Sequence, residues 1–188
     1  IGDTITLTST VSPKNASQNV TWSSSNTNIA IVSNGIVTAK AVGSATITVK
    51  TSNGKTATCN VTVTPIEATS IALNKTSATL KVGENTSLSV TYTPSNATTK
   101  SVTWTSDNNS IATVSNGVVT AKSVGSAVIT AKTSNGKTAT CKVTVNPIDV
   151  TSISLNETEK TIEQGKTTTI YATVSPSNAT VKTIKWSS

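Results

Sequence analysis

Apolar and polar residues alternate along most of the chain with a period of two, the pattern of a β-strand with one buried face. Two long runs show it most clearly, and their inward positions are Ala127, Ile129 and Ala131, then Ala139, Cys141, Val143 and Val145. Shorter runs predict further strands at 70–73, 78–82, 87–93, 101–106, 111–115 and 118–121. No run keeps the helical period beyond one turn, so the pattern predicts an all-β protein.

Turn signals separate these runs. Asn-Gly, the pair that two-residue hairpin turns with positive φ favour, occurs at Asn34-Gly35, Asn53-Gly54, Asn116-Gly117 and Asn135-Gly136. Seven or eight short strands per repeat, with a turn signal about every ten residues and no helix, predict a β-sandwich.

The chain is built from an internal repeat. Trp22, Trp104 and Trp186 each stand 82 residues apart, and Thr51–Cys59 recurs unchanged at Thr133–Cys141. A period of this length is too long for a solenoid and suits a string of small domains.

Two short segments with a central proline, 64–67 and 146–149, read as linkers in which Pro65 and Pro147 end a strand and stiffen the joint. The predicted domains are 1–65, which lacks its first strand, 66–146, which is complete, and 147–188, the N-terminal part of a third. Either the sequence is a window of a longer chain, or neighbouring molecules exchange strands at unpaired sheet edges.

Composition narrows the function classes. The 188 residues carry 15 lysines and no arginine against 8 acidic residues, a net charge of +7, and 35% are hydrophobic, so each core is expected to be thin. The lysines are scattered, and the absence of arginine argues against nucleic-acid recognition. Attraction to an acidic cell-wall polymer is compatible with the charge, but no sequence feature indicates it. No run is long enough for a membrane helix, and the start lacks signal-peptide features, so any export signal is expected outside this segment.

An ordered set of motifs in the second repeat resembles the bacterial immunoglobulin-like group 2 domain family. The motifs are Ser70–Asn74, Val82–Glu84, Val102–Ser106, Ile111–Val114, Asn116–Ala121, Val124–Ala127, Ile129–Ala131 and Val143–Val145. The first repeat carries the same signature over Val20–Val63, and the third carries its opening portion. The resemblance implies tandem immunoglobulin-like sandwiches of seven to eight short antiparallel strands, joined end to end. It also implies a stalk or adhesive module of bacterial surface proteins, phage tails or virions, without a catalytic residue.

Cys59 and Cys141 take equivalent places, one in each of the first two domains, so they cannot pair within a domain. Both fall on the inward face of a last strand and are predicted to be buried thiols that pack as small apolar groups. The alternative, a cross-link between chains, needs an exposed strand.

Aromatic residues are few. Trp22, Trp104 and Trp186 are predicted to be core residues, since Val102 shares a face with Trp104 and immunoglobulin-like sandwiches bury a tryptophan on the third strand. The alternative is stacking on a sugar. Tyr92 is expected to point inward with Leu88 and Val90 of the run 87–93. Tyr171 is expected to point outward, too isolated to form a site.

The acidic residues do not suggest a metal centre. Glu67 and Asp149 occupy matched linker positions, but a Ca²⁺ site needs six to eight oxygens, and the whole chain has 8 acidic residues. The cluster Glu157, Glu159 and Glu163 reads as a solvated strand end. The chain has no histidine to act as a base or zinc ligand. We therefore predict no catalytic, cofactor-binding or metal-binding residue and no cofactor.

The function predicted from the sequence is a non-catalytic stalk or fibre module of an extracellular bacterial surface or phage protein, a semi-rigid rod of similar domains. The expected partners are neighbouring copies of the domain, the same protein in a filament, or a cell-wall or host-surface glycan or protein, without nucleic acid. One alternative is an adhesin module, although the loops at 95–101 and 106–110 are small and polar. The other is a filament subunit assembled by strand exchange.

Overall fold

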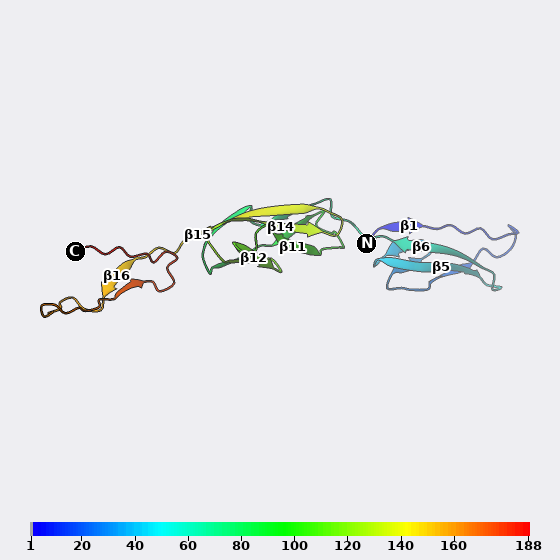
Figure 1. Cartoon of the computed structure of the whole chain (residues 1–188). Helices are drawn as coiled ribbons and strands as arrows, with labels where there is room; N and C mark the ends of the chain where they lie inside the picture. The colour runs from blue at the N-terminus through cyan, green and yellow to red at the C-terminus, as the bar shows by residue number, and fades with distance from the viewer. Residues whose placement is uncertain (1) are drawn as a thin grey trace. The chain divides into compact units, whose positions relative to one another are not determined.

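The computed structural model describes residues 2–188, which contain strands and no helix (Figure 1). The first repeat holds β1 (Thr4–Thr6), β2 (Val20–Ser24), β3 (Ala30–Ser33), β4 (Ile36–Ala39), β5 (Gly43–Thr51) and β6 (Thr56–Val63). The second holds β7 (Ser70–Leu73), β8 (Ser77–Lys81), β9 (Asn85–Ser87), β10 (Val90–Thr93), β11 (Val102–Ser106), β12 (Ala112–Ser115), β13 (Val118–Ala121), β14 (Gly125–Thr133) and β15 (Thr138–Asn146). The third holds β16 (Ser152–Leu155) and β17 (Ala172–Ser175). The all-β prediction is confirmed.

The chain forms two compact units. One contains the residues up to Glu67 together with Asn96–Thr99, and the other contains Ala68–Ser95 and Lys100–Ser188. The boundaries proposed from the sequence, after residues 65 and 146, stay a prediction.

The second repeat has the layered pairing of a sandwich. One sheet has the order β11-β14-β15-β8, a second has the order β12-β13-β9, and β10 pairs with β7. All pairs are antiparallel except β15 with β8, which run parallel with Val145 opposite Leu80. The opening segment is therefore divided, because β7 pairs with β10 while β8 joins the four-stranded sheet.

The run 87–93, predicted as one strand, is interrupted at Leu88 and Ser89. Before the interruption β9 pairs with β13, and after it β10 pairs with β7. The buried Leu88 donates its backbone N–H to the carbonyl of Gly117 at 2.8 Å, and Ser89 donates its N–H to the side-chain oxygen of Asn74 at 2.9 Å. The backbone of the interruption thus keeps its hydrogen bonds while the chain changes partner.

The turn between β12 and β13 is the two-residue hairpin that its sequence predicts. Asn116 and Gly117 have φ angles of 48° and 81°. A Cβ added to Gly117 would lie 2.5 Å from the carbonyl oxygen of Leu88 and 3.2 Å from the Trp104 ring. In the first repeat a Cβ on Gly35 would meet the carbonyl of Leu7 in the same way. Glycine is required here for contact distance as well as for φ.

The other two Asn-Gly pairs do not form two-residue turns, contrary to the prediction. Between β14 and β15 the N–H of Thr133 bonds to the carbonyl of Lys137 at 2.9 Å, which leaves three residues in the loop. Only Gly136 has a positive φ there, 84°. The Oγ1 of Thr133 accepts the N–H of Lys137 at 2.8 Å and so favours the longer loop. The loop at Asn53-Gly54 has the same hydrogen bonds.

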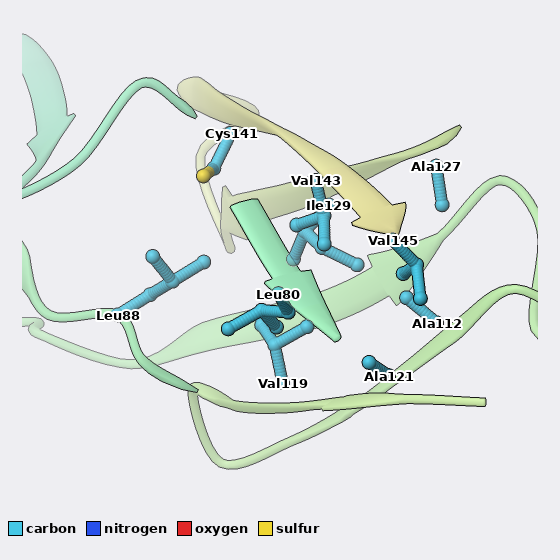
Figure 2. Close-up of a cluster of buried hydrophobic side chains, with 10 residues drawn as sticks. All are labelled: Leu80, Leu88, Ala112, Val119, Ala121, Ala127, Ile129, Cys141, Val143 and Val145. Carbon is cyan, nitrogen blue, oxygen red and sulfur yellow. The ribbon is translucent and has the colours of Figure 1, made fainter. Parts of the chain in front are cut away.

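The core of the second repeat lies between its sheets. Figure 2 shows its ten buried side chains, which are Leu80, Leu88, Ala112, Val119, Ala121, Ala127, Ile129, Cys141, Val143 and Val145. The inward positions predicted for β14 are confirmed, as are Cys141, Val143 and Val145 on β15, while Ala139 is half-buried. Leu80 comes from β8, so the opening segment supplies part of the core.

Equivalent sequences form strands only where their pairing partners are present. Residues 9–12 correspond to β10 but form no strand, since the counterpart of its partner β7 would precede this sequence. Residues 184–188 correspond to β11 and form no strand, since the counterpart of β14 would follow Ser188. By contrast β16 and β17, the counterparts of β7 and β10, are both present and pair. A segment thus becomes a strand here only when the neighbouring strand that supplies its backbone hydrogen bonds is also part of the sequence.

We predict that Gly117→Ala destabilises the second repeat more than Gly136→Ala does. Both glycines have nearly the same positive φ, 81° and 84°, but a Cβ on Gly136 meets nothing within 4 Å. Backbone strain alone costs about 1 kcal/mol, whereas forcing apart Leu88 and Trp104 adds about 1–3 kcal/mol. Urea denaturation of the two variants measures the difference, and equal losses in the free energy of unfolding would contradict the close approach.

Candidate functional site

The acidic and cysteine side chains of residues 2–188 are dispersed over the three repeats. Between residues 2 and 188, no group of three or more His, Cys, Asp or Glu side chains is placed to hold a metal ion. Glu67 and Asp149 are exposed at their linker positions, as are Glu159 and Glu163. Glu157 forms an ion pair with Lys160, 2.7 Å between Oε2 and Nζ. The acidic residues thus lie apart on the surface.

The two cysteines, predicted to be equivalent, differ. Cys141 is fully buried, and burial raises the pKa of its thiol, an effect that the positive charge of Lys75 partly opposes. Cys59 is exposed, so the prediction of a buried thiol is wrong for it. β7 and β8 both contact β15 in the second repeat, and their counterparts in the first would precede this sequence. Cys59 therefore lacks the cover that Cys141 has.

The three tryptophans also differ. Trp104 and Trp22 are half-buried and pack against the cores of their repeats, as predicted. Trp186 is 60% exposed, contrary to the prediction. Trp104 lies opposite Ala131 of β14, and the counterpart of β14 would lie beyond Ser188. The exposure of Trp186 follows from the absence of that strand in this sequence and does not mark a sugar platform.

The two tyrosines behave as the alternation predicts. Tyr171 is 66% exposed, whereas Tyr92 is half-buried, and burial raises its pKa. The Tyr92 hydroxyl donates to the carbonyl of Lys100 at 2.6 Å, and the Lys100 ammonium donates to the carbonyl of Ser95 at 2.7 Å. These bonds close the loop 95–100 upon itself.

The same loop binds the residue that follows each linker proline, a feature that the sequence analysis missed. The N–H of Ile66 donates to Oγ1 of Thr98 at 3.0 Å, and the N–H of Thr98 donates to the carbonyl of Ile66 at 2.9 Å. Ile148 and Thr180 repeat this pair at 2.6 and 2.8 Å. We name this arrangement the linker clamp. The shared tetrapeptide Ser-Asn-Ala-Thr at 95–98 and 177–180 was the available signal.

A hollow of about 520 Å³ in the first repeat corresponds to the place of an opening strand. Val11, Pro13, Val49 and Asn53 are among its lining residues. In the second repeat Asn135, the equivalent of Asn53, donates its side-chain amide to the carbonyl of the buried Ala68 at 2.8 Å. The geometry of the complete repeat thus explains this hollow as a strand position, not as a small-molecule pocket.

Sheets that pack around a shared core, a half-buried tryptophan against that core, and an opening segment divided between the four-stranded sheet and the β7–β10 pair define an immunoglobulin-like β-sandwich. The family model described as "Bacterial Ig-like domain (group 2)" matches residues 1–61 and 67–143. The chain belongs to this family, which confirms the resemblance seen in the sequence.

Known relatives cover a range of protein types. The chain is 43% identical over 118 residues to an uncharacterized protein of Clostridium acetobutylicum, covering 61% of this chain and 12% of that protein. It is 33% identical over 128 residues to an Ig-like virion protein of Serratia phage KSP90, covering 65% of this chain and 50% of that protein. Among solved structures, the S-layer protein rSbsC shares 28% sequence identity with this chain. The match covers 78% of this chain and 22% of the rSbsC chain, with a TM-score of 0.44. The chain thus spans half or less of the length of these relatives.

No helix within residues 2–188 has the length and apolarity required to cross a membrane.

We predict that a thiol reagent distinguishes the two cysteines in the folded 188-residue chain. The exposed Cys59 reacts at once, whereas the buried Cys141, whose pKa is raised, reacts at least about 100-fold more slowly because it requires local opening. Mass spectrometry of labelled peptides gives both rates, and Cys59→Ser removes the fast reaction as a control. Equal native rates would contradict the burial of Cys141, and both thiols should react rapidly in urea.

Proposed function

We propose that this chain is a stalk or fibre segment of an extracellular bacterial surface protein or virion, without catalytic activity. The observation that carries the proposal is the linker clamp, which recurs with the same atoms at Ile66 and Ile148. Flexible linkers are rich in glycine and serine. The segments 64–67 and 146–149 contain proline and no glycine. Linkers that are hydrogen-bonded at matched positions suit a module that keeps length and stiffness.

The relatives support an extracellular or virion location for the chain. The Ig-like protein of Serratia phage KSP90 is a virion protein, and this chain covers half of it. We therefore place the chain outside the cell, on a bacterial surface or a virion, with further copies of the same module as its neighbours. The modules would be 1–65, 66–146 and 147–188.

The loops favour a stalk over an adhesin that grips its ligand with loops. In the loop 106–110, a carboxylate oxygen of Asp107 accepts the N–H of Val128 at 2.7 Å. The side-chain oxygen of Asn108 accepts the N–H of Ser110 at 3.1 Å and its hydroxyl at 2.5 Å. These polar groups stabilise the loop itself, and loops with internally satisfied side chains offer a partner little to bind.

A filament assembled by strand exchange is the second candidate. The specific observation is the hollow of the first repeat, which corresponds to the place of an opening strand. Strand addition to an exposed edge is an established way of joining chains. In a longer chain, the residues that precede this sequence could fill the same hollow. Electron microscopy of the full-length protein separates the two candidate functions. Rods with regularly spaced beads support the stalk, and long filaments support strand exchange.

We predict that Thr98→Val loosens the linker without unfolding the repeat. The variant removes the Oγ1 atom that accepts the N–H of Ile66, a bond with a net value of about 0.5–1.5 kcal/mol. Because the loss of this bond lowers the free energy of local opening by the same amount, hydrogen exchange at the Ile66 amide should accelerate roughly two- to tenfold. In electron micrographs, the distribution of bend angles between the repeats on either side of this linker should broaden.

Thr99→Val is the matched control, because Thr99 is also half-buried and its hydroxyl makes no hydrogen bond in the structure. It should leave both the exchange rate and the bend angles unchanged. Identical bend-angle distributions for Thr98→Val and the unmodified chain would contradict the clamp as the source of stiffness.

A further inference from the structure

The outward face of the four-stranded sheet in the second repeat is polar and basic. Threonine and serine occupy most outward positions of β11, β14, β15 and β8, and the charged residues among them are Lys81, Lys132 and Lys142. All three lysines are exposed. We call this surface the lysine–threonine face.

The strand register places the three lysines in a diagonal row. Lys132 on β14 lies opposite Thr138 of β15, Lys142 lies four residues further along β15, and Lys81 on β8 lies opposite Asn146, four residues further again. Each step therefore crosses one strand and advances four residues, which separates successive lysines by about 14 Å. This spacing exceeds the Debye length of about 8 Å at physiological salt, so mutual repulsion costs little.

Few negative charges oppose this row. The second repeat has seven lysines and three acidic residues, Glu67, Glu84 and Asp107. None of the acids lies within the four strands. Glu84 and Asp107 use their carboxylates to accept the backbone N–H groups of Lys81 and Val128. Among residues 2–188 the structure has one ion pair, in the third repeat, so no lysine of this face forms an ion pair, and the one carboxylate beside the row is that of Glu84, 2.8 Å from the backbone nitrogen of Lys81.

The side chains around the lysines specify the chemistry of a partner. The strand positions on this face carry no aromatic side chain on which a base could stack, and the chain has no arginine for bidentate recognition of guanine. Hydroxyl groups of threonine and serine both donate and accept hydrogen bonds and match the hydroxyls of a sugar or polyol. A lysine ammonium attracts a phosphate or carboxylate as a point charge.

We propose that the lysine–threonine face binds a hydroxyl-rich, anionic glycopolymer of the bacterial cell wall, with the polymer laid along the lysine row. The first repeat differs, because it has Lys50 at the position of Lys132 but Asn60 at the position of Lys142. Asn60 is also engaged, accepting a hydrogen bond from Thr46 at 2.9 Å. The first repeat therefore lacks the middle lysine of the row, and the proposed binding does not depend on the stiffness of the joints.

The test measures binding of the 188-residue chain to poly(glycerol phosphate) by biolayer interferometry at 50 and 150 mM salt. The unmodified chain should bind, and more weakly at the higher salt. Removing one exposed charge contact should weaken binding about three- to fivefold, so Lys81→Gln, Lys132→Gln and Lys142→Asn together should weaken it at least about thirtyfold. Lys142→Asn introduces the residue that the first repeat has at that position, so the strand is expected to tolerate it.

The matched control removes the same net charge elsewhere, with Lys14→Gln, Lys40→Gln and Lys122→Gln, all exposed positions outside the strands. It should retain binding within about twofold, since none of these three lysines lies on the strands that form the face. Equal loss in the two triple variants would overturn the proposal, because net charge alone would explain binding. No binding at 50 mM salt, equal affinity for an uncharged dextran, or equal affinity for single-stranded DNA would also overturn it.

Discussion

The close approach of Gly117 to Leu88 and Trp104 is the constraint on which the sandwich depends. Gly117 lies in the turn between β12 and β13, Trp104 comes from the other sheet, and Leu88 lies where the opening half of the repeat changes from β9 to β10. One glycine without a Cβ thus lets both sheets and the interrupted strand meet. Gly35 makes the same approach to Leu7 and Trp22 in the first repeat. The first two repeats therefore share this close approach of a turn glycine to a leucine and a tryptophan, as they share the sequence motifs.

The opening segment explains why equivalent residues have different surroundings. In the second repeat it contributes Leu80 to the core, and both of its strands contact β15, which carries Cys141. Its counterpart in the first repeat would lie outside this sequence, and there the equivalent Cys59 is exposed. Because a thin core contains few residues, the presence or absence of a single strand changes whether a side chain is buried. The exposure of Cys59 therefore follows from strand pairing and does not by itself mark a binding site.

The proposed stiffness of the stalk and the proposed binding of a wall polymer involve different parts of one repeat. The loops use their polar groups internally, and loop 95–100 holds the linker through Thr98. The side chains on the outward face of the four-stranded sheet point away from the core and do not hold a loop or a linker. The proposed binding of a wall polymer therefore does not compete with the hydrogen bonds that the loops make internally.

The sequence by itself determined the repeat, the family, most of the strand pattern and most core positions of the second repeat, because period-two alternation and Asn-Gly turns are local signals. It also located the acidic, cysteine and aromatic residues that were candidates for a site. The tertiary structure decided the rest. Residues 20–24 and 184–188 both contain Trp-Ser-Ser, yet only the first segment is a strand, because its partner β5 is present. The linker clamp and the lysine row likewise join residues that are distant in the chain, and backbone groups and charges meet across strands only after folding has set the register.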